Sequence, residues 1–405
     1  MLDDFGQRIR DIILSEMDLS RELSDEEICD LIGSVVSREA RDRPMTIKDR
    51  AELERTIFNS LRKLDVLQEL VDDRDVTEIM VNGPNDIFYE KAGRIQRFKG
   101  HFSSEEKLED VIQQIVGRHN RVVNQASPIV DTRLSDGSRV NIVLNPISIG
   151  GSAISIRKFP EHPMSMERLV EIEALSPEVA RLLQVLTQAK YNIFISGGTG
   201  SGKTTFLNAL SQYIPDDERI ITIEDSAELQ LLGAKNIVRL ETRNANTDGV
   251  TPITIRDLIR TALRMRPDRI IVGECRGAEA LDMLQAMNTG HDGSLSTGHA
   301  NSPQDIISRI ETMVLQGQDF PLNAIRQQIA SGIDIIVQLG RLRDKSRRVL
   351  EISEVDGFMD GEIVLHTLYR FEETGVLDSG RIQGFLKKAG TLCHTDKLMA
   401  AGLSV

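Results

Sequence analysis

Apolar residues recur at three- and four-residue steps through the first 72 residues, as they do on the buried face of an amphipathic helix. The segments 18–25 and 42–46 interrupt this pattern and have the composition of connectors. We therefore predict a small helical bundle over residues 1–72. Three stripes carry the prediction: Phe5, Ile9, Ile12, Ile13 and Met17; Ile28, Leu31, Ile32 and Val35; Leu53, Ile57, Leu61 and Leu64.

Residues 73–160 change to short apolar segments separated by turn residues, which is the pattern of strands. Ser103 and Glu106 have the spacing of a capping box, so a helix is expected from there to about Val116. Strands with a helix among them predict a compact α+β domain. Two prolines and little periodicity follow, and we place a linker over residues 161–173. The predicted strands span residues 77–83, 86–91, 94–98, 128–134, 139–144 and 153–159.

Strand and helix patterns alternate over residues 174–343, which predicts a parallel sheet with flanking helices and hence an α/β fold. The clearest helical pattern spans residues 254–264. Two closing strands are expected within residues 347–371, followed by an irregular or helical tail. We take residues 174–405 as one domain. The predicted strands span residues 191–196, 219–224, 236–240, 269–273, 293–298 and 334–339.

The composition is that of a globular protein, and it narrows the classes of partner. Apolar residues make up 40% and charged residues 27% of the 405 residues, so the chain is neither disordered nor fibrous. The net charge of −13, the absence of Trp and the 4% of aromatic residues disfavour non-specific nucleic-acid binding and a base-stacking channel. The three cysteines lie far apart, which excludes a Cys-rich zinc module and fits a reducing cytoplasm. With no signal-peptide pattern and no apolar run of roughly 18 residues, we expect a cytoplasmic protein that reaches a membrane only through partners.

The strongest motif is residues 197–204, Gly-Gly-Thr-Gly-Ser-Gly-Lys-Thr, which matches the phosphate-loop pattern G-x-x-x-x-G-K-[ST] in full. A predicted strand precedes it and a helical segment follows, as the motif requires. Its backbone N–H groups would surround phosphate oxygens, with Lys203 reaching the β- and γ-phosphates and Thr204 binding Mg²⁺. The predicted nucleotide-binding residues are Gly198, Thr199, Gly200, Ser201, Gly202, Lys203, Thr204 and Thr205.

Acidic residues follow two of the predicted buried strands. Glu274 ends the segment 268–274, and nucleotide hydrolysis needs a carboxylate near the metal and the attacking water. Glu224 ends the segment 221–224 and is a candidate on the metal side, with Asp225 as a second choice or as a helix N-cap. The predicted Mg²⁺ ligands are Thr204, Glu224 and Glu274.

Histidines and arginines near the strand ends are weaker signals. His291 and His299 are predicted near the same sheet edge, where they would sense phosphate, although isolated histidines are more often simply packed or hydrogen-bonded. Zinc is disfavoured because no third or fourth ligand lies at useful spacing. Hydrolytic motors often complete a site with arginine, but for any single arginine a salt bridge or a solvated position is the commoner role. The candidates are Arg239, Arg243, Arg256, Arg260, Arg264, Arg266 and Arg276, and in the α+β domain Arg133, Arg139 and Arg157.

Four blocks in a fixed order resemble the secretion ATPases of type II and type IV secretion and type IV pilus systems. The blocks are the phosphate loop at 197–204, an Asp box at 223–225, a second acidic strand end at 272–274 and a His box at 289–299. The segments 76–84, 241–243 and 264–268 resemble the CpaF branch, which powers tight-adherence (Flp) pili. The resemblance is strong over about residues 50–345. The four-cysteine zinc module that many type II secretion and pilus-extension ATPases carry after the His box is missing, because only Cys393 follows His299.

The resemblance implies a PAS-like N-terminal domain, a RecA-like motor domain and a ring of subunits that form a hexamer. It implies that ATP sits between the two domains and that arginines from a neighbouring domain complete the site. By motif, Glu274 resembles the catalytic carboxylate, Glu224 a metal-side acid and His299 the phosphate-contacting histidine. The full catalytic set expected is Glu274, Lys203, Glu224, His299, Arg139, Arg157 and Arg243.

We therefore expect a cytoplasmic, Mg²⁺-dependent ATPase that works as a homohexameric motor for pilus assembly, with retraction or related secretion as further possibilities. Its expected partners are inner-membrane platform proteins, with indirect contact to pilins and no nucleic acid. Residues 1–72 carry no catalytic motif and are a candidate docking or regulatory module. Two alternatives stay open: a RecA-like nucleic-acid translocase, and a nucleotide-gated scaffold that binds ATP without turnover.

Overall fold

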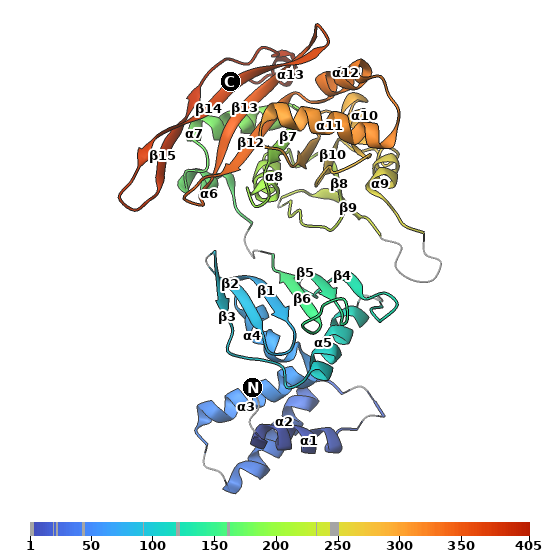
Figure 1. Cartoon of the computed structure of the whole chain (residues 1–405), viewed down its shortest axis with the longest axis vertical. Coiled ribbons are helices and arrows are strands. Elements are labelled where there is room, and N and C mark those ends of the chain that lie inside the picture. The colour runs from blue at the N-terminus through green and yellow to red at the C-terminus, as the bar shows by residue number, and fades with distance from the viewer. Residues whose placement is uncertain are drawn as a thin grey trace. The chain divides into compact units, whose positions relative to one another are not determined.

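A computed structural model of the chain describes residues 4–405 apart from 19, 22, 43, 44, 92, 119–121, 160–162, 232 and 244–250. The described chain divides into two compact units (Figure 1), one within residues 4–159 and the other within residues 163–405. Pro44, in the second predicted connector, and Pro160, before the predicted linker, lie outside the described residues.

The first unit begins with helices whose apolar faces pack together. Ser24 and Thr46 start two of them through capping boxes, each accepting the N–H of the third helical residue. The three predicted apolar stripes lie on these helices except for Met17 and Leu64, which follow α1 and α3. Leu64 is buried with the strands of the sheet instead. The core cluster of the helices consists of Ile9, Ile13, Ile28, Ile32, Val35, Val36 and Ile57. The elements are α1 (Asp4–Glu16), α2 (Asp25–Glu39), the 3-10 turn η1 (Ala40–Asp42) and α3 (Ile47–Arg62).

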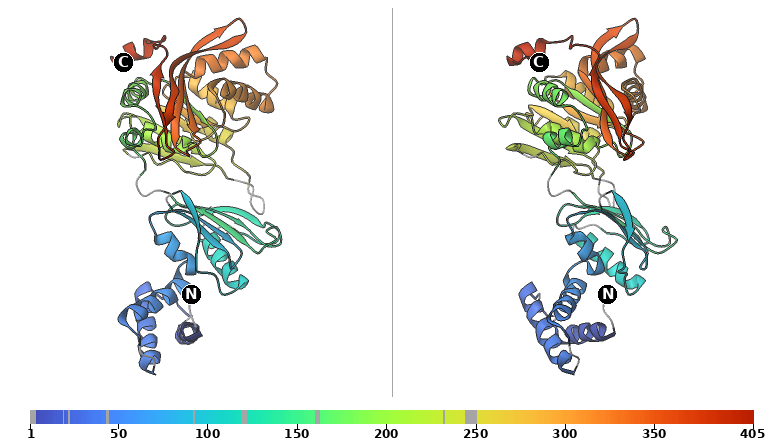
Figure 2. Two further views of the ribbon diagram at one scale, coloured as in Figure 1. Left: turned by 60° about the vertical axis from the view of Figure 1, so that its left-hand side comes forward. Right: turned by 90° about the vertical axis from the view of Figure 1, so that its left-hand side faces the viewer.

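A six-stranded antiparallel sheet with the order β3-β2-β1-β6-β5-β4 completes the first unit. Helices α4 and α5 lie on one of its faces (Figure 2), and Leu108 and Ile112 of α5 are buried there with Ile79 and Ile142 of the strands. The predicted helix is confirmed, but its N-cap is Ser104 rather than Ser103. The elements are η2 (Asp65–Leu67), α4 (Gln68–Asp72), β1 (Val76–Asn82), β2 (Ile87–Lys91), β3 (Arg94–Arg97), α5 (Glu105–Gly117), β4 (Ile129–Arg133), β5 (Arg139–Val143) and β6 (Ala153–Arg157).

The second unit is built on a nine-stranded sheet with the order β15-β14-β13-β12-β7-β11-β10-β8-β9. Strands β12 to β9 in this order pair in parallel, as predicted, whereas β12, β13, β14 and β15 pair antiparallel. The strands are β7 (Ile193–Gly197), β8 (Arg219–Glu224), β9 (Asn236–Glu241), β10 (Arg269–Val272), β11 (Leu295–Gly298), β12 (Ile335–Arg341), β13 (Arg347–Met359), β14 (Glu362–Val376) and β15 (Ile382–Lys388).

Strand β15 corrects the predicted irregular or helical tail. It pairs with β14 through Phe371 and Leu386, among other positions, and so extends the sheet. Gly384 interrupts its apolar alternation, and glycine in the interior of a strand weakens it. The strand therefore forms because it pairs with the long strand β14, and the local sequence of β15 does not predict this pairing.

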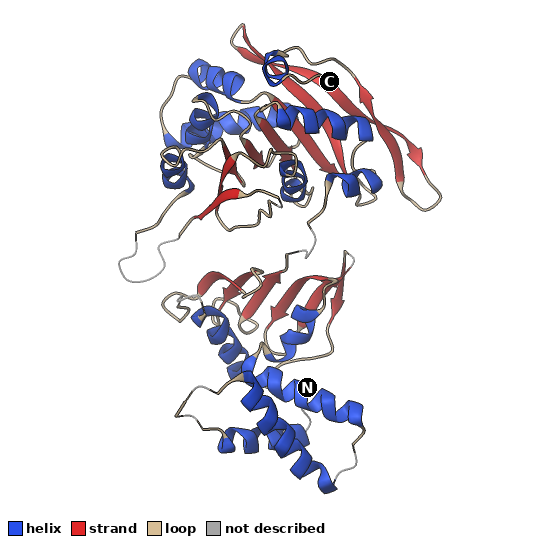
Figure 3. Ribbon diagram, turned by 180° about the vertical axis from the view of Figure 1, so that it is seen from behind, coloured by secondary structure: helices blue, strands red, loops and turns tan. Residues whose placement is uncertain are grey.

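Helices cover both faces of the sheet (Figure 3), and each face has its own core. Part of the predicted linker 161–173 is helix α6, whose Met166 and Leu169 are buried in the first of these cores. None of the described helices has the length and apolar character that a membrane span requires. One face carries α6 (Met166–Glu171), α7 (Pro177–Gln188), α8 (Lys203–Ser211) and α13 (Asp396–Ala401), and the other carries α9 (Ile255–Ala262), α10 (Ala280–Asn288), α11 (Pro303–Gly317) and α12 (Leu322–Gly332).

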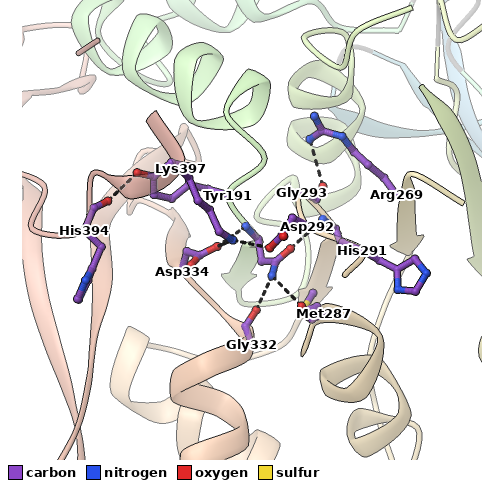
Figure 4. A network of polar contacts seen from close by, with 12 residues as sticks. Tyr191, Arg269, Met287, His291, Asp292, Gly293, Gly332, Asp334, His394 and Lys397 are labelled. Carbon is purple, nitrogen blue, oxygen red and sulfur yellow. Dashed lines mark hydrogen bonds and ion pairs between the residues drawn. The ribbon is translucent and has the colours of Figure 1, made fainter. Parts of the chain in front are cut away.

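Polar contacts fasten the C-terminal segment to the beginning of β7 and β12 (Figure 4). The Lys397 ammonium donates to Asp334 at 2.7 Å and to Asp292 at 2.8 Å. The Tyr191 hydroxyl donates to the carbonyl of His394 at 2.6 Å, and burial raises the pKa of Tyr191 to about 12. Burial also raises the pKa of Asp334, although Lys397 opposes that rise. Helix α13 is thus held at the end of the sheet where β7 begins.

Candidate nucleotide-binding site

The phosphate loop joins the buried strand β7 to the first turn of α8. Gly200 and Gly202 adopt φ values of 72° and 94°, in the left-handed region that favours glycine. At Gly197 a Cβ would lie 2.7 Å from the Leu339 carbonyl of neighbouring β12, so no larger residue fits. A Cβ at Gly198 or Gly200 would meet no atom within 4 Å, so the space beside the loop is open. The α8 N-terminus therefore opens onto a glycine-lined space that suits an anion.

Lys203 is held within its own loop. Its side chain is buried, and Nζ donates to the carbonyls of Gly197 at 3.0 Å and Gly198 at 3.2 Å. A third partner is His299, whose Nδ1 lies 3.1 Å from Lys203 Nζ. Burial lowers the pKa of Lys203, and the nearby carboxylate of Glu274 opposes this effect.

His299 connects the phosphate-loop lysine to the acid that follows β10. Its Nε2 lies 2.7 Å from Glu274 Oε1, on the opposite side of the ring from Lys203. An ammonium can only donate, so Nδ1 accepts from Lys203 and the ring proton sits on Nε2, the nitrogen that faces Glu274. Burial and the charge of Lys203 lower the pKa of His299, in agreement with a neutral ring.

Glu274 is ionised and paired in this arrangement. Arg276 Nη2 donates to its Oε2 at 2.6 Å. Burial opposes ionisation of Glu274, but the hydrogen bond and charge of Arg276, with the charge of Lys203, outweigh it and lower the pKa. A carboxylate held in this way is a weak base, so Glu274 would have to separate from Arg276 before it accepts a proton from water.

Glu224 follows β8, which lies beside β10 in the parallel sheet. Its Oε1 accepts the backbone N–H groups of Glu228 at 2.8 Å and Leu229 at 2.9 Å, so part of the carboxylate supports a loop. A Cβ at Gly273 would lie 2.8 Å from Glu224 Cγ, which puts Glu224 against the backbone just before Glu274. The two predicted metal-side acids thus meet at one sheet edge, as their strand ends indicate.

Asp225 does not act as a helix N-cap, because the described residues directly after it form no helix. Burial raises the pKa of Asp225, with the charge of Arg276 opposing the rise. That alternative for Asp225 is therefore wrong.

The donor set at the loop suits Mg²⁺. No three His, Cys, Asp or Glu side chains gather into a metal cage within the parts of the chain that the structure describes. Mg²⁺ in nucleotide sites needs no such cage, because waters and phosphate oxygens supply most of its ligands. The Thr204 hydroxyl in the first turn of α8 and the carboxylates of Glu274 and Glu224 are hard oxygen donors of the kind it prefers.

The predicted arginines lie in different parts of the chain. Arg139 of β5 stands directly opposite Arg157 of β6 and Arg133 of β4, so the three form a row across the sheet of the first unit. Arg157 also pairs with Glu78 at 3.4 Å. Arg243 follows β9 in the second unit and donates to the carbonyl of Thr251 at 3.2 Å. Their contact with a nucleotide remains a prediction.

His291 is a correction to the predicted site. It lies in the turn before β11, whereas His299 follows the end of that strand, so the two histidines occupy opposite edges of the sheet. Its Nδ1 lies 3.2 Å from the carbonyl of Ala286, and Figure 4 shows it with Gly293 and Arg269, at the strand beginnings. Both histidines follow a Thr-Gly pair in the sequence, and this shared pattern does not indicate which end of the strand each histidine occupies.

One residue at the loop was missed. Arg347, at the beginning of β13, donates from Nε to the carbonyl of Gly200 at 2.9 Å. The two residues are 147 positions apart, and no motif connects them. The only local signal is a basic turn between two predicted strands.

Comparison with known proteins finds a family model and curated relatives that match most of the chain. The protein-family model described as Type II/IV secretion system protein matches residues 60–382. A putative conjugal transfer protein of Mycobacterium tuberculosis is 33% identical over 322 residues, which cover 77% of this chain and 91% of the relative. The type IV secretion system protein PtlH of Bordetella pertussis is 33% identical over 320 residues, which cover 73% of this chain and 94% of the relative.

Solved structures share the fold. The pilus retraction motor PilT with bound ADP has a TM-score of 0.55 and 22% identity, covering 82% of this chain and 84% of that chain. The ATPase DotB of Legionella pneumophila has a TM-score of 0.53 and 22% identity, covering 72% of this chain and 80% of that chain. The family match over most of the chain, the close curated relatives and the phosphate-loop geometry agree: the chain belongs to the Type II/IV secretion system protein family, and the protein is an ATPase.

Proposed function

We propose that this ATPase is a hexameric motor of the CpaF branch, which powers assembly of tight-adherence (Flp) pili at the inner membrane. The observation that carries its motor chemistry is the chain of contacts from Lys203 through His299 to Glu274. It connects the lysine proposed to bind phosphate to the proposed catalytic acid, so that nucleotide binding at Lys203 would change the contacts of Glu274. The CpaF assignment depends on the segments 76–84, 241–243 and 264–268.

ATP would bind with its phosphates at the N–H groups of residues 198–205, and Lys203 would exchange the Gly197 and Gly198 carbonyls for phosphate oxygens. Thr204, Glu224 and Glu274 would hold Mg²⁺, which when bound neutralises charge on the β- and γ-phosphates. Glu274 Oε2, once released by Arg276, accepts the proton of the attacking water. His299 then contacts the γ-phosphate and orients Glu274 through Nε2.

The proposed hexamer would add arginines of the first unit to the nucleotide site. Arg139 and Arg157 of the first unit would reach a nucleotide in the ring, and Arg243 is the candidate from the second unit. The strand order β12-β7-β11-β10-β8 supports a RecA-like motor domain over residues 174–405. Residues 73–160 are proposed as a PAS-like domain, 161–173 as a linker that contains α6, and 1–72 as a docking or regulatory module.

The proposed location is the cytoplasm, with attachment to the inner membrane through pilus platform proteins and indirect contact with pilins. Related secretion is the second candidate, because relatives carry the names conjugal transfer protein and type IV secretion system protein. Flp pili on the surface of a complemented deletion strain decide between the two. Normal piliation without the gene overturns the pilus assignment.

Steady-state phosphate release tests the motor itself. Wild type should turn over ATP, Lys203→Ala should lose binding, and Glu274→Gln should bind without turnover. A wild-type protein that binds ATP and releases no phosphate would be the nucleotide-gated scaffold. Strong stimulation by DNA that disappears with added salt would instead support the nucleic-acid translocase.

A further inference from the structure

The hairpin between β12 and β13 rises beside the phosphate loop. Strand β12 pairs in parallel with β7, and Leu339 stands opposite Gly197. The chain therefore passes the loop once on β12, turns at residues 342–346 and returns on β13. This places the first residue of β13, Arg347, next to the phosphate loop.

Arg347 lies along the glycines of the loop. Its Nε donates to the carbonyl of Gly200 at 2.9 Å, and its Cδ would be 3.6 Å from a Cβ built at Gly202. Successive side chains of a strand point to opposite faces. Arg348 accordingly points into the protein, where it is buried and donates to the carbonyl of Ile382 at 2.9 Å.

The turn that carries Arg347 is held in place. The Asp344 carboxylate accepts the Ser346 hydroxyl at 2.6 Å and the N–H of Ile382 at 2.7 Å. These bonds lower the pKa of Asp344 to about 2, so the carboxylate is ionised throughout the physiological range. On the same turn, Arg343 is engaged by Glu373 of β14. The backbone that carries Arg347 is therefore held by contacts within the protein itself.

The remaining donors of Arg347 have no acidic partner among the described residues. A guanidinium carries five N–H groups, and only Nε is used by Gly200. Within the described residues no Asp or Glu forms an ion pair with Arg347, although most arginines of this turn and its surroundings have one. The side chain is exposed beside an anion-binding loop. Unused guanidinium donors at such a place suit phosphate oxygens.

We propose that Arg347 binds the phosphate chain of the nucleotide in its own subunit. The inference rests on the proposed nucleotide site, and it adds a substrate-binding arginine from the same second unit as the loop. On nucleotide binding, the guanidinium keeps or exchanges its bond to Gly200 and donates its other N–H groups to phosphate oxygens. Because ADP and ATP share the phosphates at the loop, both should depend on Arg347.

Titration of the full-length protein with a fluorescent ATP analogue and with ADP tests this. Arg347→Ala should weaken both nucleotides about tenfold or more, as expected for loss of a charge-assisted hydrogen bond. Arg347→Lys should recover part of the affinity because it keeps the charge. Arg168→Ala, which removes an exposed arginine of α6 that pairs with Glu171, is the control and should bind like wild type. Wild-type affinity in Arg347→Ala overturns the inference.

Arg347→Gln separates substrate contact from mere support of the loop. Gln keeps a donor for the Gly200 carbonyl but has no charge. Substrate contact predicts that Gln behaves like Ala, whereas support of the loop alone predicts that Gln behaves like wild type and overturns the inference. Lys203→Ala gives the reference for the site itself: if it binds ATP normally, the proposed site fails, and if it alone loses binding, only the role of Arg347 fails.

Discussion

His299 Nε2 lies 2.7 Å from Glu274 Oε1. Since the other nitrogen of the same ring lies 3.1 Å from Lys203 Nζ, the histidine is shared by the loop that binds phosphate and the acid proposed to act on water. In the proposed nucleotide complex Lys203 would turn to a phosphate, Nδ1 would lose its donor, and the ring would be free to move with Glu274. In the proposed nucleotide complex, phosphate binding is thereby connected to the position of the carboxylate through the two contacts of this ring.

Glu274→Gln should keep ATP binding and lower turnover by at least about a hundredfold, the range expected for loss of a general base. The amide retains the shape of the carboxylate but cannot accept a proton. Phosphate release gives the rate and nucleotide titration gives the affinity. Glu171→Gln, which removes an exposed partner of Arg168, is the control and should hydrolyse ATP normally. Near wild-type turnover in Glu274→Gln would show that another residue is the base.

The shifted pKa of His299 predicts a pH-dependent loss of stability. Burial and Lys203 lower its folded-state pKa below the ordinary value of about 6.5, so the unfolded chain binds this proton first as pH falls. The free energy of unfolding should therefore decrease as the pH falls below about 6.5, and this decrease ends once the pH is below the folded-state pKa. The measurement is the chemical unfolding midpoint as a function of pH.

His299→Gln is the comparison for that measurement, because Gln offers both a donor and an acceptor but does not titrate. The wild-type midpoint should fall more steeply with decreasing pH than the midpoint of His299→Gln. His394, whose pKa is raised by its bond to Asp356 despite burial, is present in both proteins and cancels. Parallel curves for the two proteins would contradict a neutral, shielded His299.

Elements whose signal is local could be predicted from the sequence. The stripe of Ile28, Ile32 and Val35 lies on α2, and the phosphate loop stands between β7 and α8 as its motif requires. Glu224 and Glu274 meet because neighbouring parallel strands end at the same edge of the sheet. The alternation of strand and helix patterns in the sequence already predicts parallel strands. These features depend on periodicity and strand direction alone.

Features that depend on distant pairing could not be predicted. Strand β15 forms because β14 offers an edge, and Gly384 hides its pattern. His291 and His299 share a local sequence, yet β11 between them carries the two rings to opposite edges. Arg347 reaches Gly200 only because β12 pairs beside β7, and no single segment of the sequence records that register.

The row of arginines on β4, β5 and β6 should contribute to ATP turnover if the first unit completes the nucleotide site in a ring of subunits. Arg139→Ala and Arg157→Ala should each lower turnover about tenfold or more, with the fold and the midpoint of unfolding little changed. Arg97→Ala is the control, since Arg97 belongs to the same sheet but pairs with Asp86 at 2.6 Å. Unchanged turnover in both variants would rule out their contribution.

Specific activity should also rise with protein concentration until assembly is complete.

The Lys397 ion pairs predict a stability effect that leaves the nucleotide site unaffected. Lys397→Met keeps the apolar stem but leaves the largely buried Asp334 without its ammonium, and should lower the free energy of unfolding by about 2 kcal/mol. Lys387→Met is matched in chemistry, but its pair with Glu372 is exposed, so its cost should stay below about 1 kcal/mol. ATP affinity should be unchanged in both, because α13 is held where β7 begins and the phosphate loop follows where β7 ends. Chemical unfolding and nucleotide titration of the two variants measure this. Equal destabilisation by both substitutions would mean that the contacts of Lys397 contribute no more than a surface pair.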